Sequence, residues 1–225
     1  MLPFGAAESD YASLRTFEVR QTAFDPCDGK RHWVYVGVCG SYMTFALRSL
    51  FAALLRALEK QPALRRDLRL HFIGTDYAPK NRATKTVEPL AREAGLTDMI
   101  VEQTDRLPYF EALQCLLDAD ALIVPGSDDP GYTASKIYPY ILARKPLLAV
   151  FHESSTVINV LRATKAGTVV AFANGEDPNA VSHRIQTAWF DKLPPASPDT
   201  DWNAFEPYSA REMTRKLCSV FNNCL

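Results

Sequence analysis

The sequence has little that would place the chain in a membrane, outside the cell or on nucleic acid. No apolar run reaches the ~20 residues that span a bilayer. The opening MLPFGAAESD lacks the basic start and the apolar stretch of a secretory signal. The 25 Lys and Arg residues balance 26 Asp and Glu residues, which leaves no strongly basic footprint for nucleic acid. We therefore expect a soluble, cytoplasmic protein that binds no nucleic acid.

Cysteine is scarce and scattered, which argues against a disulfide framework or a zinc knuckle. An odd number of thiols without a secretory signal indicates a reducing compartment. Cys39 lies in a tight turn, where a reactive thiol is one interpretation and a small buried side chain is the one we favour. No pair has the two-residue gap of a metal knuckle among the five cysteines, Cys27, Cys39, Cys115, Cys218 and Cys224.

The sequence does contain a regular alternation of apolar and amphipathic segments. Short apolar, β-branched runs predict strands at residues 32–38, 68–74, 99–103, 121–125, 146–151 and 167–172. Apolar residues at helical spacing predict helices at 43–60, 85–94, 109–119, 135–144, 155–164 and 177–190. Gly95 is suited to end the second of these helices. The alternation predicts an α/β fold, a Rossmann-like doubly wound parallel sheet of about six strands with helices on both faces.

The two ends of the chain lie outside this alternation. Residues 1–31 are polar and are interpreted as a linker and lead-in segment, and residues 32–192 as the Rossmann-like domain. Residues 193–225 are predicted to form a Pro-rich connector and a last helix at 209–222. That helix begins with Ser209 and, three residues later, Glu212, the spacing of a capping box.

The loop after the fourth predicted strand is the most informative. In open α/β sheets a ligand lies beyond the carboxyl ends of the strands, where the strand order reverses. Lys136 has an unfavourable charge for the first turn of a helix. A bound diphosphate would explain it, and a solvated Lys136 beside a capping Ser135 is the alternative. The candidate binding residues in this loop are Gly126, Ser127, Asp128, Thr133, Ser135 and Lys136.

Two other loops contribute candidates. The turn after the first strand contains Gly37, Gly40 and Ser41, and its glycines would let the backbone approach an anion or a sugar. A tight turn without a ligand is the alternative. After the third strand, Arg106 and Tyr109 are candidates for contact with a base or a phosphate. A surface arginine and a core tyrosine are the alternatives there.

Three stretches resemble the C-terminal, donor-binding half of GT-B glycosyltransferases, the retaining, glycogen-synthase-like group (glycosyltransferase family 4, group 1). LPFGA at residues 2–6 resembles the linker that enters the donor domain. RLPYFEALQCLLDADALIVPGS at 106–127 resembles the helix and strand that lead to the donor loop. SKIYPYILARKPLLAV at 135–150 is similar to the pattern S-K-x-x-E-Y-x-A-x-x-K-P-x-x-A-V.

The resemblance implies that residues 32–192 bind a nucleotide-diphosphate sugar, UDP- or GDP-linked, without an obligatory metal. Ser135 and Lys136 match the phosphate-side residues, and Gly37 and Gly40 match the turn that faces the sugar and the diphosphate. Arg106 and Tyr109 fall near the base-contacting segment, and no catalytic residue is identified. The acceptor would be held by an N-terminal domain absent from this chain, so we expect the isolated chain to be inactive. The complete enzyme would lie in the cytoplasm or at the membrane periphery.

The chain departs from the family at two positions. Pro139 and Gly131 occupy the places of the family's two glutamates, the later of which holds the ribose hydroxyls. Asp128 or Asp129 is the substitute that the sequence offers. The last helix, which packs onto the N-terminal domain in the full fold, is expected to expose an apolar face and to favour self-association.

Two alternative functions stay open. The first is a non-catalytic Rossmann-like interaction module, which Pro139 favours and the Ser135–Lys136 pair opposes. The second is a nucleotide-sugar epimerase of the GT-B type, which needs acid and base residues in the cleft. The candidates for those roles are Asp128, Asp129, His152 and Glu153, although the adjacent His152 and Glu153 point apart.

Overall fold

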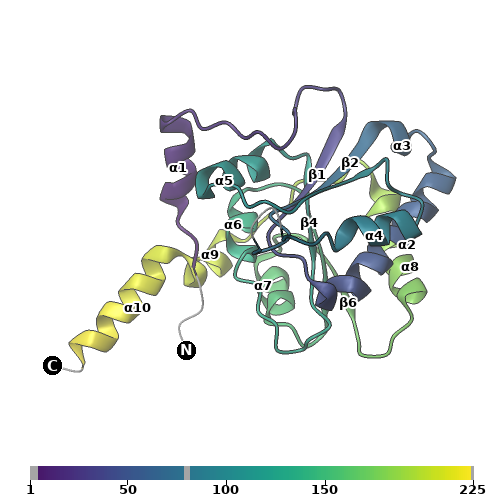
Figure 1. Cartoon of the computed structure of the whole chain (residues 1–225). Helices are drawn as coiled ribbons and strands as arrows, with labels where there is room; N and C mark the ends of the chain where they lie inside the picture. Colours follow the sequence, from purple (N-terminus) through teal and green to yellow (C-terminus); the bar gives the residue numbers. More distant parts are fainter. Residues whose placement is uncertain (1–4, 79–81, 224–225) are drawn as a thin grey trace.

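A computed structural model of the chain describes residues 5–78 and 82–223 and contains one parallel sheet (Figure 1). The strand order is β3-β2-β1-β4-β5-β6, and every neighbouring pair is parallel. This order confirms the doubly wound α/β fold. All predicted strands are confirmed, with small shifts at their ends: β1 (Arg31–Val36), β2 (Leu68–Ile73), β3 (Ile100–Gln103), β4 (Ala121–Pro125), β5 (Leu147–His152) and β6 (Thr168–Phe172).

Helices cover both faces of the sheet. Helix α2 packs against α4 and α8 on one face, and α5, α6 and α7 lie on the other (Figure 1). The α-helices are α1 (Glu8–Thr16), α2 (Thr44–Lys60), α3 (Leu64–Asp67), α4 (Val87–Glu93), α5 (Tyr109–Asp118), α6 (Ile137–Leu142), α7 (Thr156–Thr164), α8 (Pro178–Ala188), α9 (Trp202–Phe205) and α10 (Ala210–Asn222). Short 3₁₀ turns are η1 (Ser41–Met43), η2 (Phe190–Lys192) and η3 (Glu206–Tyr208).

Local sequence explains where several helices begin and end. Gly95 adopts a φ of 66° after α4, and the N–H groups of Gly95 and Leu96 donate to the carbonyls of Arg92 and Ala91. This is the Schellman arrangement, in which a left-handed glycine satisfies the last carbonyls of a helix. Side chains of Ser155 and Asp177 accept from the backbone at the starts of α7 and α8. The hydrogen bonds around Gly95 thus confirm the predicted end of α4.

The last helix is held to the body only at its start. Ser209 Oγ accepts from the Glu212 N–H at 3.1 Å, which is one half of the predicted capping box. The Glu212 carboxylate does not return to the Ser209 N–H but accepts from Arg215 instead. Beyond this point α10 extends away from the sheet (Figure 1), and three apolar side chains on it are exposed, Leu217, Val220 and Phe221.

Helices α1 and α6 differ from the sequence prediction, and the short helices α3 and α9 were not predicted. Helix α1 lies in the segment interpreted as a linker. It was not predicted because it buries only Tyr11 and Leu14, so its sequence shows little apolar periodicity. Helix α6 is shorter than the predicted 135–144, because Pro139 has no N–H to donate to the Ser135 carbonyl and Arg144 adopts a φ of 57°. The division of the chain at residues 31 and 192 stays a prediction. Of the LPFGA stretch, residues 2–4 lie outside the described residues.

The core lies between the sheet and its helices and is rich in aromatic side chains. Trp33 of β1 is buried edge-to-face against Trp189, with 5.6 Å between ring centroids. Tyr35, two residues further along β1, is buried on the same face of the strand. Within the described residues, every helix is too short or too polar to traverse a bilayer.

Candidate functional site

A cavity of about 780 Å³ opens where the strand order reverses, at the carboxyl ends of β1 and β2. Strands β1 and β4 are neighbours but pair only at Trp33–Ala121 and Val34–Leu122. The two strands therefore diverge before β1 ends. The cavity wall is completed by the segments after β3 and β4, by helices α5 and α6, and by residues 5–7. This is the position that the sheet topology predicts for a ligand.

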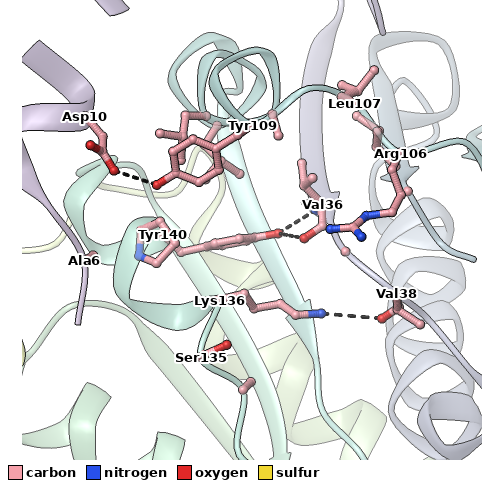
Figure 2. A pocket seen from close by; sticks show the side chains of 18 of the residues that line it. Ala6, Asp10, Val36, Val38, Arg106, Leu107, Tyr109, Ser135, Lys136 and Tyr140 are labelled. Carbon is pink, nitrogen blue, oxygen red and sulfur yellow. Dashed lines mark hydrogen bonds between the residues drawn. The ribbon is translucent and has the colours of Figure 1, made fainter. Parts of the chain in front are cut away.

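Tyr140 of α6 bridges the gap between the diverging strands. Its hydroxyl accepts from the Val36 N–H at 2.6 Å and donates to the Val36 carbonyl at 3.1 Å (Figure 2). Burial raises the pKa of this hydroxyl far above its ordinary value, so Tyr140 is neutral. The side chain thus supplies the partners that β4 would give to Val36 in a fully paired strand.

Replacing Tyr140 with Phe should lower the free energy of unfolding by about 1 kcal/mol, because water from the adjacent cavity can take up part of the lost hydrogen bonding. Urea denaturation measures this change. Tyr138→Phe is the matched control, since the Tyr138 hydroxyl has no hydrogen bond to the described residues. Equal losses in the two variants would contradict the bridging role.

Lys136 extends from the residue before α6 into the cavity. Its ammonium donates to the Tyr35 hydroxyl and, at 3.5 Å, to the Val38 carbonyl, and it lies 4.5 Å from the Tyr35 ring centroid. Burial lowers the pKa of Lys136 to about 8. Among the described residues, no carboxylate lies within ion-pair distance of this ammonium. The cavity therefore contains a cation for which the described residues offer no counter-ion.

Gly37 makes room for this ammonium. Its φ is 145°, and a Cβ at this position would lie 2.6 Å from the Lys136 Nζ. A larger residue would be strained in its backbone and would displace the lysine. Gly37 was predicted to face a ligand, whereas in the structure it first of all makes room for Lys136.

Arg106 and Tyr109, from the segment after β3, also line the cavity. The Arg106 guanidinium lies over the ring of Tyr77 at 5.1 Å and is exposed. The Tyr109 hydroxyl donates to Asp10 Oδ2 at 2.7 Å (Figure 2). Burial, with a contribution from Asp10, raises the pKa of Tyr109 to about 12. Six of the predicted residues thus lie together in the wall: Gly37, Arg106, Tyr109, Thr133, Ser135 and Lys136.

The other five predicted residues do not line this cavity. Gly126 packs against Phe151. The buried Ser127 Oγ accepts from the Asp129 N–H at 2.9 Å, and the Asp128 N–H donates to the Tyr42 carbonyl at 2.9 Å. Gly40 lies beneath the Tyr42 ring. Outside the cavity wall are thus Gly40, Ser41, Gly126, Ser127 and Asp128.

The side chains weighed for acid–base chemistry also lie outside the cavity wall. Asp129 accepts from the Gly131 N–H within its own loop at 2.8 Å. His152 is buried at the end of β5, where its Nδ1 accepts from the Ser154 N–H at 3.2 Å.

Cys39 is buried, as we expected, and burial raises the pKa of its thiol to about 12. Among the described residues, no group of three His, Cys, Asp or Glu side chains is arranged to hold a metal ion.

Several residues of the wall were not predicted from the sequence. Tyr42 and Tyr132 are in ring contact in the wall, with ring centroids 6.0 Å apart. Tyr42 and Tyr132 follow Gly40 and Gly131 by two residues and one residue. This position next to loop glycines could have identified them as candidates for the site. Asp10 enters the wall from α1, and its place in the first turn of an unrecognised helix left no signal.

Solved structures resemble the whole of this chain. The α,α-trehalose 6-phosphate synthase of Burkholderia multivorans matches with a TM-score of 0.68 and 13% identity, over 99% of this chain and 50% of that one. HepE of Anabaena, in complex with UDP, matches with a TM-score of 0.62 and 13% identity, over 97% of this chain and 54% of that one. A glycosyltransferase from Rickettsia africae matches with a TM-score of 0.57 and 16% identity, over 97% and 52%.

These likenesses establish the fold, which is that of one half of a GT-B glycosyltransferase. The expectation from the sequence resemblance is confirmed at this level. The chain spans about half the length of each of these proteins. Neither a protein-family model nor a curated protein sequence matches the chain significantly.

Proposed function

We propose that this chain is the donor-binding domain of a glycosyltransferase and that its cavity holds a nucleotide-diphosphate sugar. The observation that carries the proposal is Lys136, a cation whose pKa burial lowers and which has no carboxylate partner among the described residues. A buried charge without a counter-ion is costly for the fold. An anionic ligand that supplies the missing charge accounts for its retention.

The surroundings of Lys136 suit a diphosphate. The hydroxyls of Thr133 and Ser135 line the same wall and are hydrogen-bond donors. Arg106 lines the cavity as a second cation. In glycosyl transfer, negative charge develops on the departing diphosphate, and fixed positive charge at that point lowers the barrier. Lys136 would supply this charge, and no metal is required for that role.

Isothermal titration of the chain with UDP, GDP and their sugar conjugates, with and without magnesium, tests the proposal. We expect one diphosphate series to bind without the metal, and the corresponding nucleosides to bind more weakly because they lack the charge that Lys136 attracts. Absence of binding up to millimolar ligand would contradict the proposal and would favour the interaction module.

The acceptor is assigned to a domain outside these 225 residues. The supporting observation is that the similar structures are about twice as long as this chain. Self-association through α10 stays a prediction, based on its exposed Leu217, Val220 and Phe221.

A further inference from the structure

Asp10 is the only carboxylate among the described residues that line the cavity. It lies in the first turn of α1, and its Oδ2 accepts the hydrogen bond from Tyr109. A carboxylate has two oxygens and several acceptor sites, so Oδ1 is available to a ligand. Asp128 and Asp129, the acids that the sequence offered, lie elsewhere.

The cavity has charged groups of opposite sign on two sides, and apolar residues contribute to its wall (Figure 2). Figure 2 shows Asp10 on the side opposite to the ammonium of Lys136 and the guanidinium of Arg106. Ala112, Leu113 and Pro139 contribute apolar wall. A complementary ligand has an anionic group at one end, hydrogen-bond donors at the other, and a less polar body between them.

A nucleoside diphosphate meets this description only with certain bases. With its phosphates at Lys136, its ribose occupies the middle and the outer edge of its base lies farthest from the phosphates. Guanine presents two adjacent donors on that edge, N1–H and the 2-amino group, which match the two oxygens of a carboxylate. Uracil presents one N–H between two carbonyl oxygens, which a carboxylate repels.

We propose that Asp10 recognises the outer edge of guanine, so that the ligand of this cavity is GDP-linked. The inference rests on the proposed function, because it takes the phosphates to lie at Lys136. Tyr109 is a positioning residue that holds the carboxylate toward the cavity through its hydroxyl.

Titration of the wild-type chain and of Asp10→Asn with GDP, IDP and UDP tests this assignment. IDP lacks the 2-amino group but is otherwise identical to GDP. The wild type should bind GDP about ten- to a hundredfold more tightly than UDP, with IDP between them. Asp10→Asn should remove most of this preference. Its single acceptor oxygen cannot pair with both guanine donors side by side, and UDP should bind equally well or more tightly because the charge that repels the uracil carbonyls is gone.

Glu8→Gln is the matched control, because Glu8 is exposed in the same turn of α1 and does not line the cavity. It should retain the GDP preference. Thermal melts of both variants establish that they are folded, and the Asn side chain can still accept from Tyr109.

The other outcomes separate this inference from the proposed function. If Asp10→Asn weakens GDP and UDP equally, Asp10 contacts the ribose and the guanine assignment is wrong. If it changes neither affinity while Lys136→Met weakens both, the phosphate site stands and Asp10 has no role in recognition. If no nucleoside diphosphate binds to the wild type, both proposals fail.

Discussion

Replacing Lys136 with Met is expected to weaken the binding of nucleoside diphosphates by about ten- to a hundredfold and to leave the melting temperature equal or higher. Hydrogen bonds to charged groups contribute about 1.5–3 kcal/mol, and about 1.4 kcal/mol corresponds to a factor of ten in affinity. Met keeps the apolar stem against Tyr35 but removes a partly buried charge for which the described residues offer no counter-ion. Titration and thermal melts measure the two effects.

Lys145→Met is the control for this variant, because it removes the same charge from a residue outside the cavity wall. Its diphosphate affinity should stay close to that of the wild type. Nucleoside binding should be nearly unchanged in both variants. An equal loss of nucleoside and nucleoside-diphosphate affinity in Lys136→Met, or a fall in melting temperature, would instead assign Lys136 a structural role.

The pH dependence of binding provides a second measurement on the same variant. Since the pKa of Lys136 is lowered to about 8, the ammonium loses its proton as the pH rises from 7 to 9, and affinity should fall. Lys136→Met should show no such fall. In the absence of ligand, the contribution of Lys136 to folding stability depends on pH with the opposite sign. Between about 8 and 10.5 the Lys136 side chain binds more protons in the unfolded chain than in the folded one, so the contribution of Lys136 to stability rises with pH.

Gly126→Ala is expected to lower the free energy of unfolding by about 2–3 kcal/mol, the cost of overpacking a core. A Cβ at this position would lie 2.5 Å from Phe151 Cδ1 and 2.9 Å from Phe151 Cα. The second contact is to backbone, so a change of side-chain rotamer cannot relieve it. The Gly126 N–H, just after β4, donates to the Val150 carbonyl of β5, so a displacement of Gly126 also strains β5. Urea denaturation measures the change.

Gly131→Ala, in the same loop, is the matched control. The nearest atom to a Cβ there is Asp129 Oδ1 at 3.3 Å, and the residue is exposed. Its effect should lie within about 0.5 kcal/mol. If both variants retain wild-type stability, the close packing of Gly126 is not rigid.

The sheet could be predicted from the sequence because its strands are buried on both faces and form near-continuous apolar runs. Helix α1 could not, because only Tyr11 and Leu14 mark its buried side. Missing α1 also meant missing Asp10. From their positions in loops after strands, both Gly37 and Gly126 were predicted to contact a ligand. In the structure Gly37 leaves space for Lys136 and Gly126 leaves space for Phe151.

The anomaly at Lys136 was visible in the sequence, but its cause was not. A lysine near a helix start indicates an unusual environment without saying where the side chain goes. In the structure the Lys136 side chain lies over the ring of Tyr35, a residue about 100 positions earlier in the chain. Likewise, the hydrogen bonds of Tyr140 to Val36 arise because β1 and β4 diverge, a property of the folded sheet.

The absence of tryptophan from the described wall of the cavity gives the protein two different optical signals. Trp33 and Trp189 are buried together in the core, and Trp202 lies against the Arg144 guanidinium at 4.4 Å. None of the three lines the cavity, whereas five tyrosines do: Tyr42, Tyr77, Tyr109, Tyr132 and Tyr140. Tryptophan emission therefore follows unfolding of the core, and a change in the tyrosine bands of the near-ultraviolet circular dichroism on adding a ligand reports on the cavity.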